Sequence, residues 1–138
     1  MLTPYFPARL TQYAIAAGFL SFGAVALGAP DFLRALMARP EFQTGYPIVG
    51  LAIGALGAHA VAAGLFAAFK RFASWTFIGF GVATLPILAA DYWLYAKAAT
   101  FNDLLFLHVG GIVAMLGLCI RGFRIMQQHE QAFDEQPA

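Results

Sequence analysis

Apolar residues are gathered in four long stretches of this chain, and polar residues are rare inside each stretch. The stretches cover about residues 10–28, 46–69, 73–96 and 104–120. Each is close to the roughly 20 apolar residues that a helix needs to cross a bilayer core about 30 Å thick. The sequence lacks the alternation of apolar and polar positions that a membrane barrel requires. The pattern therefore predicts four transmembrane helices and an all-α polytopic membrane protein.

Composition supports a membrane location and excludes several other classes of protein. Of the 138 residues, 61% are apolar and 11% are charged, whereas a soluble domain is roughly 45–50% apolar and about 25% charged. Disordered chains have the opposite composition. The net charge of +1 offers no basic surface for nucleic acid. We therefore expect a single membrane domain over residues 1–138, with the lipid bilayer as its partner and no nucleic-acid partner.

The segment between the first two stretches, residues 31–39, has the pattern of a short amphipathic helix. Its apolar residues share one helical face: Phe32, Leu33, Leu36 and Met37. Such a helix can lie in the membrane interface, either packed over the bundle as a cap or in contact with lipid. The expected fold is an antiparallel bundle of four transmembrane helices, with a short interfacial helix between helices 1 and 2.

Lysine and arginine residues predict the orientation, because they are more frequent in cytoplasmic loops. Five lie on the side of the two termini and the second loop: Arg9, Lys70, Arg71, Arg121 and Arg124. Three lie on the other side: Arg34, Arg39 and Lys97. Both termini are thus predicted to be cytoplasmic. The first stretch is expected to be kept as a helix rather than cleaved as a signal, and residues 125–138 to extend the last helix as a polar tail.

Small residues are expected to bring the helices into close contact, because helix packing in lipid depends on them. The best stripe lies in the second stretch: Gly50, Gly54, Ala58 and Ala62, with Gly57 and Gly64 nearby. Similar contacts are expected at Gly79 and Gly81 and at Gly110, Gly111 and Gly117. We expect these residues to pack within the bundle. A homo-oligomer or a membrane protein partner bound through small-residue faces stays open.

Asp91 and His108 are the ionisable residues near the ends of the third and fourth stretches. With a rise of 1.5 Å per residue, Asp91 lies roughly 9 Å and His108 about 7–8 Å below the same membrane boundary. An ionisable group costs about 2.5–3.5 kcal/mol in a spanning helix and calls for a partner. Since the two depths match on consecutive antiparallel helices, the sequence predicts an Asp91–His108 pair.

His59 is the third ionisable residue, and it lies in the middle of the second stretch. It is about 17 Å from either boundary, at the depth of Ser21 in the first stretch. It is also about 9–10 Å deeper than the other two ionisable residues. We therefore expect His59 to bond to Ser21 or to a backbone carbonyl rather than to Asp91, and we regard His59 and Ser21 as candidate ligand-binding residues.

A carboxylate beside an imidazole can act in three ways in a membrane, and the sequence leaves all three open. The pair can be structural, lowering the cost of polar groups in lipid, or it can exchange protons as acid and base, or it can bind a ligand. Bis-histidine haem is not expected, because His59 and His108 differ in depth. No metal site and no other cofactor are expected.

Aromatic residues cluster near the outer end of the third stretch, where Tyr92, Trp93 and Tyr95 follow Asp91 directly. They are expected to form an interfacial aromatic belt, with ligand lining as the alternative. Pro86 lies earlier in the same stretch and removes one backbone hydrogen bond. A kink is therefore predicted just before Asp91.

The chain resembles small four-helix bacterial integral membrane proteins of the DoxX-like and uncharacterised families. The features that carry the resemblance are Gly28-Ala29-Pro30 at the end of the first stretch, the amphipathic residues 31–39, Gly64, Asp91 and His108. Such relatives tend to carry an arginine where this chain has Ala58-His59. The resemblance implies a multi-pass protein of the cell inner membrane, and it supplies no catalytic residues.

Three functions stay open on the sequence alone. The leading hypothesis is a non-catalytic accessory or structural subunit with a buried Asp91–His108 pair. The alternative is a membrane enzyme of isomerase or cyclase type, with both residues as acid and base on a lipophilic substrate. A second alternative is a small proton-coupled carrier that uses Asp91. An apolar cavity of several hundred cubic ångströms at both side chains would favour the enzyme, whereas a sealed pair would exclude it.

Overall fold

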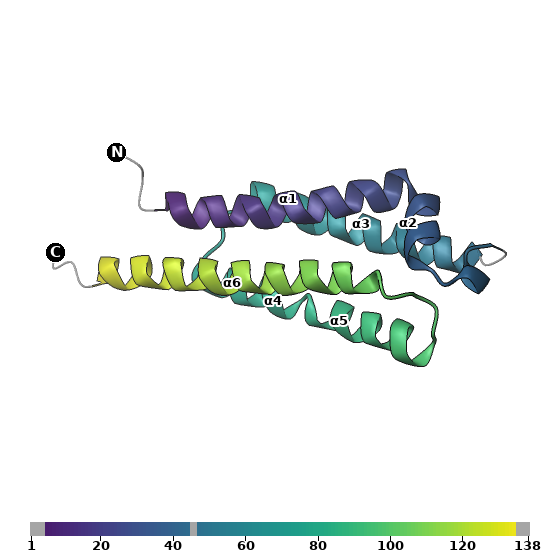
Figure 1. Ribbon diagram of the computed structural model, residues 1–138. Coiled ribbons are helices and arrows are strands. Elements are labelled where there is room, and N and C mark those ends of the chain that lie inside the picture. Colours follow the sequence, from purple (N-terminus) through teal and green to yellow (C-terminus); the bar gives the residue numbers. More distant parts are fainter. Residues whose placement is uncertain (1–4, 45–46, 135–138) are drawn as a thin grey trace.

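The computed structural model describes residues 5–44 and 47–134, and all regular secondary structure in these two ranges is helical. In chain order the elements are α1 (Phe6–Gly28), α2 (Pro30–Met37), the 3₁₀ turn η1 (Pro40–Phe42), α3 (Pro47–Phe69), α4 (Ser74–Val82), α5 (Leu85–Tyr92), the π-helical turn η2 (Trp93–Lys97) and α6 (Leu105–Asp134). The start of α1 and the end of α6 lie at one end of the molecule, called here the terminal end (Figure 1). The helix α2 and the end of α5 lie toward the opposite end, called the loop end (Figure 1).

Four helical spans are long and apolar enough to cross a membrane. They are Phe6–Gly28, Pro47–Phe69, Ser74–Lys97 and Leu105–Ala132. The all-helical fold and the four helical spans of membrane-crossing length that the sequence predicts are therefore confirmed. The last helix continues well beyond the predicted end of its apolar stretch, so the expected helical extension into the polar tail is present as far as Asp134.

The third span is not one continuous helix, because α4 ends at Val82 and α5 begins at Leu85. Pro86 lies in the first turn of α5 and has no N–H group, so the α-helical hydrogen bond to the Val82 carbonyl cannot form. In the same segment Thr84 donates from Oγ1 to the Gly81 carbonyl over 2.7 Å, which is not the carbonyl that Pro86 leaves free. The kink predicted from Pro86 is thus present as a break in the helix.

The closest approach of two helices is that of α1 and α3, which meet at glycines on both sides. A Cβ atom built on Gly57 would lie 2.7 Å from the Cβ of Ala26. One built on Gly64 would lie 2.7 Å from Cγ of Leu20, and one on Gly23 only 2.9 Å from the Gly57 carbonyl oxygen. Backbones at this distance leave no room for a side chain, so glycine is required at these positions.

The stripe of small residues that was expected to pack inside the bundle does not do so. A Cβ on Gly54 would meet nothing within 4 Å, and one on Gly50 only an arginine nitrogen at 3.8 Å. Ala58 and Ala62 are exposed. The buried face of α3 is a neighbouring one, made of Val49, Ile53, Gly57, Ala60, Gly64 and Ala67. Both faces are apolar and rich in small residues, so spacing alone did not distinguish them.

The glycines of the third and fourth spans also include some that pack against a neighbouring helix and some that do not. Gly81 packs as expected, since a Cβ there would lie 3.3 Å from the Cβ of Cys119 on α6. The expectation is wrong for the following positions, where an added Cβ would meet nothing within 4 Å: Gly79, Gly110, Gly111 and Gly117. Gly122, which the spacing did not single out, packs directly against the Phe77 ring.

At the terminal end, polar side chains form hydrogen bonds with backbone groups at the ends of α3 and α4. The buried amide of Gln12 on α1 donates to the carbonyls of Ala67 and Lys70, where α3 ends. On the other side, the Glu130 carboxylate of α6 accepts from the Ser74 N–H at 3.1 Å and from Ser74 Oγ at 2.7 Å, where α4 begins. Backbone groups that a helix end leaves free are satisfied in this way, and α6 is held to α4 almost as far as the described helix reaches.

At the loop end, the two connections of the chain are joined to each other. Ala38 and Phe101 form an isolated antiparallel bridge. The Arg39 N–H donates to the Thr100 carbonyl over 2.9 Å, and the Asn102 N–H to the Met37 carbonyl over 2.8 Å. The segment after α2 is therefore fixed to the segment before α6.

The amphipathic helix predicted over residues 31–39 is present as α2, but its apolar face is divided. Leu33 is buried and Met37 packs beside it against α1 and α3. Phe32 is 60% exposed and Leu36 38% exposed. Half of the face thus covers the bundle and half is left open.

Candidate functional site

Asp91 and His108 lie together between the end of α5 and the start of α6. Nδ1 of His108 is 2.8 Å from Oδ2 of Asp91. The Asp91 side chain is 4% exposed and that of His108 is 14% exposed. The pair predicted from matching depths is therefore formed, and Asp91 is the more deeply buried partner.

The bond to Asp91 determines which nitrogen of His108 is left for other contacts. When the Asp91 carboxylate is ionised it only accepts hydrogen bonds, and Nδ1 of His108 then carries the shared hydrogen. Nε2 then accepts a hydrogen bond in the neutral ring and donates one in the protonated ring. In residues 5–44 and 47–134, Nε2 of His108 forms no hydrogen bond. Every fully buried side-chain nitrogen or oxygen in these ranges has a hydrogen-bond partner, so Nε2 is not fully buried. Nε2 therefore retains accessible surface and can form a further hydrogen bond.

The ring of His108 is also held from a second side. Phe22 of α1 stacks on it, with 4.8 Å between the ring centroids and an angle of 28° between the planes. Asp91 from α5 and Phe22 from α1 thus fix the orientation of a residue on α6. A carboxylate and a stacked ring that hold an imidazole in this way also fix the direction in which its second nitrogen points.

A cavity of about 410 Å³ lies beside this pair, in the region where α3 faces the break between α4 and α5. Its walls come from all four spans: Phe19 and Phe22 from α1; Leu56, His59, Ala60 and Ala63 from α3; Phe80, Ala83, Thr84 and Ile87 from the third span; and His108 and Ile112 from α6. His108 reaches the cavity and Asp91 does not. The volume falls within the roughly 300–1,000 Å³ of small-molecule pockets.

The cavity is mainly apolar and has few polar groups. Its lining includes the two imidazole rings and the hydroxyl of Thr84, which is bonded to Gly81. An apolar volume with one or two polar groups suits a lipophilic molecule that carries a hydrogen-bonding group. The helix break around Thr84 supplies one wall, so the irregularity caused by Pro86 lies at the cavity itself.

His59 forms a hydrogen bond with a backbone carbonyl, which was one of the two partners expected from the sequence. Its Nδ1 atom lies 2.8 Å from the Ala55 carbonyl oxygen, one turn earlier in α3. Ser21 is exposed and its side chain forms no hydrogen bond within the described ranges, so the alternative bond between Ser21 and His59 is not formed. His59 lines the cavity and Ser21 does not.

The aromatic residues after Asp91 lie outside this cavity. Tyr92 is 65% exposed and Trp93 is 57% exposed. Tyr95 donates from its hydroxyl to Oδ1 of Asp103 over 2.7 Å. Tyr95 is half-buried, and none of the three residues lines the cavity. The interfacial aromatic belt stays a prediction.

Several residues of the site could not be found by sequence reasoning. Phe22 stacks on His108 and Phe19 and Phe80 form cavity walls, but apolar residues of this kind occur throughout the chain. Thr84 was not singled out either, although it is a hydroxyl residue two positions before Pro86. Its hydroxyl donates to the Gly81 carbonyl.

No group of three or more His, Cys, Asp or Glu side chains in the described ranges is arranged to hold a metal ion. Comparisons of this chain with known proteins give no further guide to the site. No protein-family model, no curated protein and no solved structure matches it.

Proposed function

We propose that this chain is a membrane protein that binds a lipophilic molecule in the cavity between its four spans, with His108 as the polar anchor of the ligand. The observation that carries the proposal is the position of His108, whose Nδ1 is held by Asp91 while its ring lines an apolar cavity of about 410 Å³. A purely structural pair needs neither an accessible ring nitrogen nor an adjoining cavity. Ligand binding is therefore preferred to a structural or accessory subunit.

An enzyme that uses the same site is the second candidate. Nε2 of His108 can take up or release a proton, and the Asp91 carboxylate would stabilise the protonated ring. The cavity is of the size expected for an isomerase or cyclase acting on a lipophilic substrate, although only His108 of the pair lines it. In this form of the hypothesis His108 is the acid and base, and Asp91 is a positioning residue. No specific observation favours a proton-coupled carrier.

The membrane arrangement that goes with this function is an antiparallel bundle in the cell inner membrane. Both termini lie in the cytoplasm, in accord with the excess of lysine and arginine at the terminal end. The helix α2 lies in the opposite interface, where the exposed Phe32 and Leu36 meet lipid. The open Gly50–Gly54–Ala58 face of α3 is where a membrane protein partner or a second copy would pack.

The binding function can be tested with two probes of nearly the same shape, 1-naphthol and naphthalene. Binding to the purified protein in detergent is measured by probe fluorescence, and the ring nitrogens are followed by NMR of ¹⁵N-labelled histidine. We expect both probes to bind and 1-naphthol to bind about fivefold more tightly, because a hydrogen bond contributes about 1 kcal/mol. The Nε2 resonance of His108 should shift with 1-naphthol only.

Matched variants distinguish the contribution of the cavity to probe binding from the contribution of His108. Ala63→Phe fills the cavity and should weaken both probes, whereas Ala62→Phe adds the same ring on the exposed side and should not. His108→Leu should remove the preference for 1-naphthol but leave naphthalene binding, and His59→Leu should leave the preference in place. Equal binding of the two probes by the unmodified protein, or binding that Ala63→Phe does not reduce, would contradict the proposal.

A further inference from the structure

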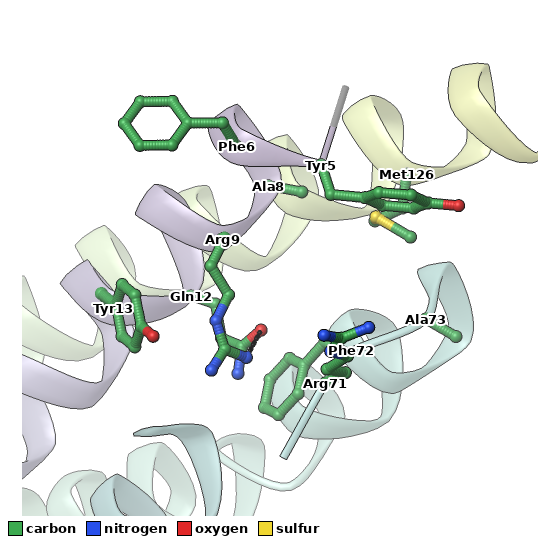
Figure 2. A pocket seen from close by; sticks show the side chains of 10 residues that line it. All are labelled: Tyr5, Phe6, Ala8, Arg9, Gln12, Tyr13, Arg71, Phe72, Ala73 and Met126. Carbon is green, nitrogen blue, oxygen red and sulfur yellow. Dashed lines mark hydrogen bonds between the residues drawn. The ribbon is translucent and has the colours of Figure 1, made fainter. Parts of the chain in front are cut away.

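A second and larger cavity, of about 760 Å³, lies at the terminal end. It is bounded by the first turns of α1, by residues 71–73 before α4 and by Met126 of α6. Figure 2 shows the side chains of Arg9, Gln12 and Phe72 converging on one side of it, with Arg71 next to Phe72. This cavity contains no residue of the central site and calls for a separate explanation.

Arg9 is held in place by the end of α3. It donates to the Lys70 carbonyl over 2.9 Å, to the Ala68 carbonyl over 3.3 Å and to Oε1 of Gln12 over 3.3 Å. Its guanidinium group also lies 4.6 Å from the centroid of the Tyr13 ring. These bonds use three of the five N–H donors of a guanidinium group, so a fixed positive charge with unused donors faces the cavity region.

Arg71 contributes a second charge and has no partner of its own. It is exposed, and it forms no hydrogen bond and no ion pair within the described ranges. No acidic residue belongs to the lining of the cavity. The nearest acidic function on α6, the Glu130 carboxylate, already accepts both hydrogen bonds from Ser74. The Glu130 carboxylate keeps its negative charge, but neither Arg9 nor Arg71 forms an ion pair with it or with any other acidic side chain in residues 5–44 and 47–134. Both guanidinium groups can therefore bind an anion at this place.

The remaining walls are apolar and lie at the membrane boundary. Phe72 and Met126 are buried at the base of the cavity, and Tyr5 and Tyr13 are half exposed at its edge. Arg9 lies in the first turn of one candidate span, and Arg71 lies between two others. Two positively charged side chains next to apolar walls at the ends of the spans suit a molecule with an anionic headgroup and a hydrocarbon chain.

From this arrangement we infer that the cavity at the terminal end is a binding site for an anionic phospholipid, with its phosphate between Arg9 and Arg71. The acyl chains pass over Phe72 toward the bilayer. A free phosphate would satisfy the same two arginines but would leave the apolar walls uncovered. The site is independent of the ligand proposed for the central cavity, so either can fail without the other.

The inference is tested by native mass spectrometry of the protein purified in a neutral detergent. Two lipids with identical acyl chains are titrated, dioleoyl-phosphatidylglycerol and dioleoyl-phosphatidylcholine. We expect phosphatidylglycerol to bind at least about fivefold more tightly, since one basic residue near an anionic lipid changes binding by about that factor. Arg71→Gln should remove most of this preference, and Arg71→Lys, which keeps the charge, should retain part of it.

Arg124→Gln is the matched control, because it removes the same charge from an exposed position of α6 that does not line the cavity. It should leave the preference unchanged. Equal binding of the two lipids by the unmodified protein would overturn the inference, and so would an equal loss in Arg71→Gln and Arg124→Gln. If inorganic phosphate abolishes the preference, or Arg71→Lys behaves as Arg71→Gln, a specific lipid site with a charge-dependent anchor is likewise excluded.

Discussion

Nδ1 of His108 lies 2.8 Å from Oδ2 of Asp91, a residue seventeen positions earlier in the chain. The bond joins the end of α5 to the start of α6, and it is the only ion pair between two helices in residues 5–44 and 47–134. It stabilises two polar groups that would each be costly in lipid alone. The bond occupies one ring nitrogen of His108 and leaves the other without a hydrogen bond in the described part of the chain.

The first prediction concerns the strength of this bond. We expect Asp91→Ala and His108→Ala to be coupled by about 1–2 kcal/mol, the upper range for hydrogen bonds between helices in membranes. The coupling is obtained from the free energies of unfolding of both single variants and the double variant in mixed detergent. If the two effects simply add, the pair does not contribute to stability.

The second prediction compares two glycines of the same helix. Gly57→Ala should lower the free energy of unfolding by about 1–3 kcal/mol, because its Cβ would overlap with Ala26. Gly54→Ala should be neutral or slightly stabilising, since the position is open and alanine favours a helix by about 1 kcal/mol. Thermal unfolding in detergent measures both. The reverse order would show that α1 and α3 do not pack at Gly57.

The third prediction concerns the buried amide of Gln12. Gln12→Leu removes the side-chain donor to the Ala67 carbonyl, whereas the Lys70 carbonyl still accepts from Arg9. We expect the free energy of unfolding to fall by about 1–3 kcal/mol, the cost of an unsatisfied buried group. Gln127→Leu is the control, because Gln127 is exposed and forms no hydrogen bond in the described part of the chain. A similar stability of both variants would mean that the end of α3 does not depend on Gln12.

The fourth prediction concerns the end of α6. Glu130→Ala should free the Ser74 N–H and hydroxyl and destabilise the protein by about 1–2 kcal/mol, as the loss of a helix cap does. Gln128→Ala, two residues earlier and exposed, should have little effect. Limited proteolysis gives a second readout, since cleavage after about residue 125 should become faster in Glu130→Ala alone.

The fifth prediction tests the orientation in the membrane. Thr44 and Gln128 are exposed and lie toward opposite ends of the molecule, and the natural Cys119 is buried. In a Cys119→Ser background, Thr44→Cys should react with a membrane-impermeant maleimide in intact cells, and Gln128→Cys only after permeabilisation. Labelling of Gln128→Cys alone would reverse the orientation, and equal labelling of both would contradict an even number of spans.

The sequence by itself determined the parts of this protein that depend on the chain's own composition and spacing. Four spans follow from apolar length, because the bilayer imposes about 20 residues per helix. The break before Asp91 follows from Pro86, which cannot donate a hydrogen bond. The Asp91–His108 pair follows from equal depth on consecutive helices, because helical rise converts residue number into distance.

Only the tertiary structure decided which faces of the helices meet. Gly57 and Gly64 pack against α1 while Gly50 and Gly54 stay open, and hydropathy cannot separate these faces because lipid is as apolar as a neighbouring helix. The same holds for the cavity, whose walls come from four spans and include His108 but not Asp91. Depth along each helix can be read from the sequence, but rotation about the helix axis is set by packing between helices.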